Sequence, residues 1–188
     1  MSGCVGYQVS QLIQEILKGD RRAQGRFYDE FSPLVMGICM RYMKSHEAAS
    51  DVFQEAFIKI FNNLGQVKNM QAVAGWIKRI TVNTALDHLR VIRYDYDVSL
   101  EANELTDQFY SDLIDKLSTE VILQAVNNLA EGYRVIFNMS VIDGFSHKEI
   151  ANELGISEST SRSQLTHARH VLKRYLNELG ITRYEQVI

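Results

Sequence analysis

A group of polar side chains near the C-terminal end has the hydrogen-bonding groups needed to read DNA bases. In a predicted helix over residues 158–172, four residues recur at i, i+4, i+7 and i+11, so they should form its inward stripe. Among the remaining residues, arginine can bind guanine through two hydrogen bonds, and smaller polar groups can bond to other base edges. The inward stripe is Ser161, Leu165, Ala168 and Leu172, and the outward residues are Arg162, Ser163, Thr166, His167 and Arg169.

Two short helices joined by a glycine turn would position this outward face. Ser146 and Glu149 have the spacing of a capping box, and Phe145 and Ile150 fit the hydrophobic staple around it. Gly155 can adopt the left-handed conformation that ends a helix. This layout predicts a helix-turn-helix, whose second helix enters the major groove. Beyond the reading residues, Lys173 and Arg174 suit phosphate contacts that set position.

A helix predicted over residues 73–93 combines one tryptophan with basic and amide side chains. Such a helix could hold unstacked bases, since single strands are bound by aromatic surfaces and basic tracks. Taken alone, the pattern favours a core tryptophan and a solvated polar face. The residues concerned are Trp76, Lys78, Arg79, Asn83, Asp87 and Arg90, three of which are spaced i, i+4, i+7.

The helix predicted over residues 48–62 has acidic and amide side chains beside an apolar stripe. Asp51, Gln54 and Glu55 flank Phe57 and Ile58. Amphipathic helices of this kind dock on partner helices. The periodicity alone equally describes a core helix with one solvated side.

Other reactive residue types form no site that we recognise. Cys4 and Cys39 lack motif spacing, and the five histidines form no metal set with them. His167 and His170 lie at i, i+3, but no cysteine or acid partner is evident nearby. Phosphate-binding glycine loops and nucleophile motifs are also lacking. We therefore expect no metal, no cofactor and no enzymatic activity.

The composition indicates an all-α fold in the cytoplasm. The 188 residues include one proline and no alternating β-branched runs, and 46% are hydrophobic. The N-terminus does not resemble a signal peptide, and no apolar run is long enough to span a bilayer. The remaining predicted elements are helices at Val9–Lys18, Arg21–Phe31, Ser32–Met43, Thr119–Asn128 and Ala130–Ile142, and a loop at Asn63–Gln71.

Charge is divided unevenly along the chain, whose net charge is −3. Residues 1–95 carry 12 Lys/Arg and 9 Asp/Glu, and residues 116–188 carry eight of each. Residues 96–115 carry six acids and no Lys/Arg. We expect two small helical domains joined by an acidic linker. Because phosphate neutralisation supplies most non-specific DNA affinity, the chain should need a partner to stay on DNA.

Together, the three helical motifs resemble the extracytoplasmic-function group of sigma-70 RNA polymerase sigma factors. DVFQEAFIKIF is similar to that family's region-two helix, WIKRITVNTALDHLR to its promoter-opening helix, and YRVIFNMSVIDGFSHKEIANELGISESTSRSQLTHAR to its region-four helix-turn-helix. The resemblance covers nearly the whole chain. It implies a region-two domain over residues 1–95, a linker over 96–115 and a region-four domain over 116–188.

The resemblance also implies partners and a role for each polar face. Core RNA polymerase, through its β′ clamp helices and β flap, and promoter DNA would be partners, and an anti-sigma factor would restrain the chain. The linker would follow the path toward the polymerase active site. The implied residues are Asp51, Gln54, Glu55 and Ile58 for polymerase; Trp76, Lys78, Arg79, Asn83, Asp87 and Arg90, with the loop 63–71, for the melted −10 element; and Arg162, Ser163, Gln164, Thr166, His167, Arg169 and Lys173 for the −35 element.

Departures from the family pattern affect the recognition helix. Ser161 stands where many members have valine, which is expected to loosen this helix against its neighbour. Thr166 and His167 replace what is often an aromatic or basic pair, so the promoter preference cannot be transferred from a relative.

Two alternatives remain at this point. A stand-alone helix-turn-helix regulator, with an N-terminal sensing or dimerisation domain, would bind duplex DNA by itself, usually on paired half-sites. An interaction module, such as an anti-sigma antagonist, would bind polymerase or a sigma factor without supporting specific transcription.

Overall fold

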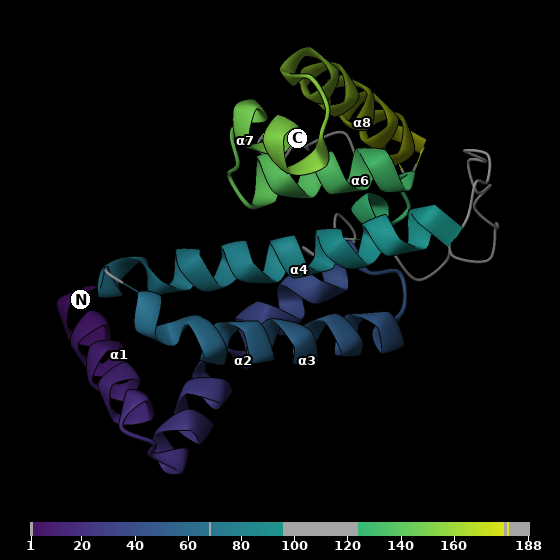
Figure 1. Cartoon of the computed structure of the whole chain (residues 1–188). Helices are drawn as coiled ribbons and strands as arrows, with labels where there is room; N and C mark the ends of the chain where they lie inside the picture. The colour runs from purple at the N-terminus through teal and green to yellow at the C-terminus, as the bar shows by residue number, and fades with distance from the viewer. Residues whose placement is uncertain (1, 68, 96–123, 179, 181–188) are drawn as a thin grey trace. The chain divides into compact units, whose positions relative to one another are not determined.

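The computed structural model describes residues 2–67, 69–95, 124–178 and 180, and the chain divides into two compact units (Figure 1). The first unit comprises residues 1–97 and the second residues 98–188. The described residues are helical with short turns and contain no strand, which confirms the predicted all-α fold. The predicted acidic linker lies outside the described residues.

The described residues of the first unit form four helices and two short 3₁₀ turns. In Figure 1, α3 and α4 lie side by side, and both also pack against α2. Helix α1 packs against α2 and the two turns. The elements are α1 (Ser2–Leu17), α2 (Arg21–Tyr42), α3 (His46–Asn63), η1 (Leu64–Gln66), η2 (Met70–Ala72) and α4 (Val73–Asp95).

The helix boundaries follow local capping, with one exception. Asp20 accepts hydrogen bonds from two backbone amides of α2, and Ser45 caps α3 by accepting one from the amide of Ala48. The predicted new start at Ser32-Pro33 is wrong, because α2 continues through Pro33. Proline removes one amide donor there. The Ser32 hydroxyl donates to the carbonyl of Tyr28 at 2.6 Å within the same turn.

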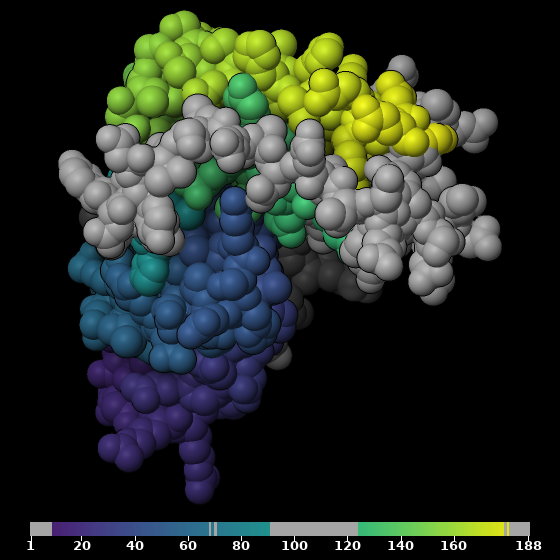
Figure 2. Space-filling view, turned by 90° about the vertical axis from the view of Figure 1, so that its right-hand side faces the viewer, coloured from purple at the N-terminus to yellow at the C-terminus, as the bar shows by residue number. Residues whose placement is uncertain are grey.

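Aromatic and aliphatic side chains from α2, α3 and α4 fill the core of the first unit. The ring centroids of Phe27 and Phe31 are 4.6 Å apart, and Phe27 lies 5.7 Å from Phe61 on α3. Thr81 and Thr84 are buried in α4, where each hydroxyl donates to the carbonyl four residues earlier. These bonds satisfy polar groups that would otherwise be costly to bury. Figure 2 shows one face of the unit as space-filling atoms.

The second unit contains the predicted helix-turn-helix. Its described elements are a helical segment at residues 124–127, α6 (Glu131–Phe137), the π-helical turn η4 (Asn138–Ile142), α7 (His147–Leu154) and α8 (Glu158–Glu178). The predicted helix over residues 130–142 therefore changes its winding at residue 138. Helix α8 packs against α6 and α7, and it runs six residues beyond its predicted end.

The capping signals read from the sequence fix the start and end of α7. Glu149 Oε2 accepts from the backbone amide of Ser146 at 2.9 Å, and the Glu149 amide donates to Ser146 Oγ at 3.2 Å. The capping box is thus confirmed. Gly155 ends the helix with φ 65°, as predicted. The serine at 157 accepts from the amide of Thr160 at 3.0 Å and so caps α8.

None of the helices in the described part of the chain is both long and apolar enough to cross a bilayer.

Candidate nucleic-acid and partner interfaces

Helix α8 has a buried stripe and a polar exposed side. All four residues predicted to face inward are buried, and Leu176 continues the stripe one turn further. Six of the seven residues predicted for the −35 element are exposed, namely Arg162, Ser163, Thr166, His167, Arg169 and Lys173. The seventh, Gln164, is half-buried. At 100° per residue, Gln164 lies about 160° around the helix from Arg162, so the two occupy opposite edges of the face.

Several groups on this face already have partners within the chain. Arg162 Nη2 donates to Glu158 Oε2 at 2.8 Å, one turn earlier. The hydroxyls of Ser163 and Thr166 donate to the carbonyls of Thr160 and Arg162, each at 3.0 Å. The two hydroxyl oxygens still have acceptor capacity. A base contact made through either O–H would therefore require the hydroxyl to turn away from the helix.

Two contacts connect α8 to its neighbouring helices. The imidazole of His167 stacks on the ring of Tyr133 from α6, with centroids 6.3 Å apart and planes 29° apart. Ser161 is fully buried, and its Oγ lies 2.8 Å from Nδ1 of His147 on α7. Ser161 therefore makes a specific polar contact between α7 and α8, which the sequence did not predict.

Helix α4 gathers most of the second predicted set on one face. At 100° per residue, five of the six residues fall within about 40° of the direction of Asn83. Lys78 is the exception, because it lies about 140° from Asn83, toward the packed side. Arg79, Asp87 and Arg90 are exposed, and Trp76, Lys78 and Asn83 are half-buried. The loop predicted before α4 contains η1 and η2, and Lys68 within it lies outside the described residues.

Asn83 has a buried acceptor in the middle of this face. Its Oδ1 has no hydrogen-bond partner among the described residues. An unsatisfied buried acceptor is costly, and native structures contain few of them. A donor supplied from outside the chain would remove that cost once the amide turned outward.

A cluster of ionisable side chains joins α3 and α4 beside this face. Glu55 accepts from Lys59 Nζ at 2.8 Å and contacts His88 Nε2 at 2.6 Å. Lys59 also lies 3.6 Å from Asp87, which pairs with Arg90 at 3.1 Å. The hydrogen bonds from Lys59 and His88 lower the pKa of the Glu55 carboxyl. The cluster therefore keeps Glu55 ionised.

Helix α3 presents the third predicted set on one exposed arc. Asp51 and Gln54 are exposed, Glu55 is half-buried, and Ile58 is 61% exposed. At 100° per residue, the four side chains span an arc of about 100°. Ile58 is a large apolar side chain in water, flanked by an acid and an amide. Such an arrangement is typical of a surface that docks another helix.

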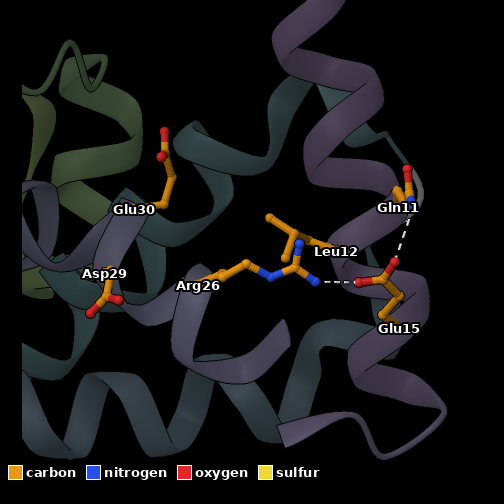
Figure 3. A pocket seen from close by; sticks show the side chains of 6 residues that line it. All are labelled: Gln11, Leu12, Glu15, Arg26, Asp29 and Glu30. Atoms are coloured by element: carbon orange, nitrogen blue, oxygen red, sulfur yellow. Dashed lines mark hydrogen bonds and ion pairs between the residues drawn. The ribbon is translucent and has the colours of Figure 1, made fainter. Parts of the chain in front are cut away.

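A hollow of about 530 Å³ lies between α1 and α2 in the first unit. Figure 3 shows Arg26 reaching from α2 to Glu15 on α1, where Nη2 donates to Oε2 at 2.6 Å. Gln11 donates to the same carboxylate at 3.0 Å. The other polar lining residues are Asp29 and Glu30, and the described lining includes no histidine and no nucleophilic hydroxyl, thiol or amine. Nor do the described residues gather three His, Cys, Asp or Glu side chains that could hold a metal ion.

Sequence reasoning missed the neighbours that hold these faces. Tyr133, His147, Lys59 and His88 act across helix pairs, and no regular spacing along the chain identifies such partners. Arg134 was missed too: it is buried in α6, where burial lowers the pKa of its guanidinium and the charge of Glu131 opposes that effect. The position of Arg134 directly before three apolar residues, 135–137, is the signal in the sequence that could have identified it.

Comparison with known proteins gives matches along nearly the whole chain. Residues 27–93 match the family Sigma-70 region 2, and residues 119–172 match Sigma-70, region 4. The RNA polymerase sigma-H factor of Pseudomonas aeruginosa is 30% identical over 92% of this chain and 95% of its own length. The ECF RNA polymerase sigma factor SigW of Bacillus subtilis is 25% identical over 91% of this chain and 98% of its own length.

A solved structure has the same fold. It is the sigma factor RpoE of Bartonella quintana in complex with the anti-sigma factor NepR, with a TM-score of 0.53 and 21% identity. The match covers 81% of this chain and 97% of that chain. At this identity the likeness concerns the fold alone.

Proposed function

We propose that the chain initiates transcription by binding promoters at two separate elements. It belongs to the sigma-70 family of RNA polymerase sigma factors, in its extracytoplasmic-function group. The observation that carries this proposal is the order of its parts. A region-two match coincides with the unit bearing the α3 and α4 faces, and a region-four match with the helix-turn-helix unit. A stand-alone regulator would require the helix-turn-helix unit but not the region-two unit.

The α8 face reads the −35 element in the major groove. Arg162 and Arg169 are exposed on the same edge of the helix, seven residues apart, where each can reach a base or a phosphate. Ser163, Thr166 and His167 contact bases along the groove, and Gln164 contributes from the opposite edge. Lys173 contacts a phosphate and so sets position without reading sequence.

The α4 face holds the melted −10 strand. Trp76, Arg79, Asn83 and Arg90 share one side of the helix, which combines an aromatic surface with two cations and an amide. A flipped base would supply the donor that Asn83 Oδ1 lacks within the described residues. Trapping unstacked bases stabilises the open strand, so melting requires no catalytic step by this chain. Asp87 orients Arg90, and Lys78 packs behind the reading face.

The exposed arc of α3 docks on core polymerase. Ile58 would be buried in the contact, and burying a large aliphatic side chain contributes about 1.5–3 kcal/mol. Asp51, Gln54 and Glu55 surround it with groups that suit basic residues of the β′ clamp helices. The second unit contacts the β flap, which holds α8 at the −35 element.

Restraint and location follow from this role. A factor that works on core polymerase acts in the cytoplasm. The RpoE structure holds an anti-sigma factor, and we propose that such a partner covers the docking and DNA faces of this chain as well.

DNA binding by the chain alone and with core polymerase tests the proposal against a stand-alone regulator. The chain alone should bind duplex fragments weakly, with no protected palindrome, because residues 116–188 carry equal numbers of acids and bases. Adding core polymerase should produce specific protection upstream of transcript starts. A palindromic footprint without polymerase would favour the stand-alone regulator instead.

A further inference from the structure

We propose that the hydrogen bond between His147 and Ser161 orients the reading end of α8 and thereby sets −35 selectivity. This inference rests on the proposed function, because it concerns the same DNA-reading helix. The two residues act as positioning residues: Ser161 is fully buried, and His147 lies on the neighbouring helix.

The bond lies at the end of α8 where orientation matters most. Ser161 is the fourth residue of the helix and directly precedes Arg162. In helix-turn-helix proteins the N-terminal residues of the second helix contact base edges. A rotation about the axis at this point moves the Arg162 guanidinium directly, since its side chain projects from the adjacent position.

The apolar packing of α8 fixes which side of the helix faces the core, but it constrains small rotations less sharply than a directional contact does. Leu165, Ala168, Leu172 and Leu176 are buried and apolar, and their contacts are not directional. A hydrogen bond weakens steeply when its angle or distance departs from the optimum. The pair at 2.8 Å therefore adds a directional constraint at the N-terminal end of α8, six residues before His167, whose ring stacks on Tyr133.

The other end of the bond is itself fixed. His147 is the first residue of α7 and follows Ser146, whose amide and hydroxyl both donate to the Glu149 carboxylate, at 2.9 and 2.8 Å. One residue earlier, the Phe145 amide donates to the carbonyl of Met139 at 2.9 Å. The imidazole thus extends from an anchored turn, so it can transmit that anchoring to α8.

Promoter selection by reconstituted holoenzyme tests the proposal. A promoter library randomised at both elements is transcribed with the full chain and core polymerase, and the transcripts are sequenced. Ser161→Ala and His147→Leu should each reduce the upstream preference roughly three- to tenfold, the range expected for one lost hydrogen bond. The downstream preference should not change.

Two further variants separate positioning from stability. His147→Asn places an amide group near the position of Nδ1, so it should retain most of the upstream preference. If the pair acts through Arg162, the double variant Ser161→Ala/Arg162→Ala should lose no more preference for the affected base than Arg162→Ala alone. Ser50→Ala is the matched control, since it removes a hydroxyl 3.5 Å from His46 Nδ1 within α3 of the first unit.

Three results would overturn the proposal. The first is an unchanged upstream preference in Ser161→Ala and His147→Leu. The second is an Asn variant as defective as the Leu variant, and the third is an equal loss at both elements that follows the melting temperature. If Ser161→Ala does not fold, the comparison of His147→Leu with His147→Asn still decides, because His147 is only half-buried. Failure of the proposed function would differ, since wild type would then show no upstream preference.

Discussion

At the scale of single residues, we propose that the polar groups of α8 divide into those that read bases and those that hold the helix on DNA. Arg162 is exposed near the N-terminal end of α8, and Glu158 holds its guanidinium at 2.8 Å. Lys173 is exposed on the third turn beyond it. A guanidinium can bind two acceptors of one base, whereas an ammonium acts as a point charge on the backbone. The two side chains should therefore contribute differently to selectivity.

Replacing Arg162 by alanine should remove selectivity at one −35 position. A lost two-point base contact costs about 1–3 kcal/mol of discrimination at that position. Lys173→Ala is the matched comparison. It should weaken binding to all promoters about equally and reduce the slope of log affinity against log salt concentration by about one. Holoenzyme binding to matched and mismatched promoters at several salt concentrations measures both. Equal selectivity in wild type and Arg162→Ala would remove Arg162 from the set of base contacts.

Glu55 should give the first unit an acid-sensitive contribution to stability. Its carboxyl pKa lies below the ordinary 4.5 because Lys59 and His88 bond to the ionised form. That stabilisation is fully present above pH 4.5 and is lost as the pH falls through the lowered value. The side chain is 41% exposed, so solvent screening limits the effect to less than about 1 kcal/mol. The melting temperatures of wild type and Glu55→Gln, measured across a range of pH, should converge in acid. A difference between them that stays constant with pH would contradict this prediction.

How far the sequence predicts these residues depends on the range of the contact. Ser146, Glu149 and Gly155 were predictable because capping involves neighbours along the chain. The partnerships of Ser161 with His147 and of His167 with Tyr133 join residues 14 and 34 positions apart. Helical periodicity indicates that Ser161 faces inward but not what it meets there.

At the scale of elements, local signals fix most helix ends, and tertiary packing overrides one of them. Ser32-Pro33 has the residues of a helix start, yet α2 passes through it. Phe31 and Val35 on either side are both buried in the core, and breaking the helix would displace one of them. The change to π-helical winding at residue 138 likewise has no signal in the periodicity.

Gly155 should be the glycine that the helix-turn-helix needs most. Its φ of 65° is unfavourable for other residues, so Gly155→Ala should cost about 1–2 kcal/mol. A Cβ there would meet no atom within 4 Å, so the cost is conformational and not steric. Gly25→Ala is the control: it lies inside α2 with equal space and should stabilise the first unit by about 0.5–1 kcal/mol.

Urea unfolding with hydrogen exchange measures these two changes. The α7 and α8 amides should exchange faster in Gly155→Ala, whereas the α2 amides should exchange more slowly in Gly25→Ala. Unaltered exchange of the α7 amides in Gly155→Ala would show that the turn tolerates alanine at this position.

At the scale of the whole molecule, we propose that two small units divide the task of promoter recognition. Each has a polar face supported by its own core: α4 and α3 in the first unit, α8 in the second. The net charge of −3 provides no general attraction to DNA, so affinity must come from polymerase and from simultaneous contacts. The two-unit, all-helical design was predictable from composition and the charge division, whereas the roles of the faces needed the family resemblance.

The most direct test of binding at two separate promoter elements is to sequence transcript starts from a randomised promoter library transcribed by holoenzyme. Wild type should select two separate blocks of sequence, one upstream and one overlapping the melted region. Arg162→Ala should reduce the sequence preference only in the upstream block, and Asn83→Ala only in the downstream block. A single block, or an upstream preference that changes with Asn83→Ala, would contradict the assignment of one promoter element to each unit.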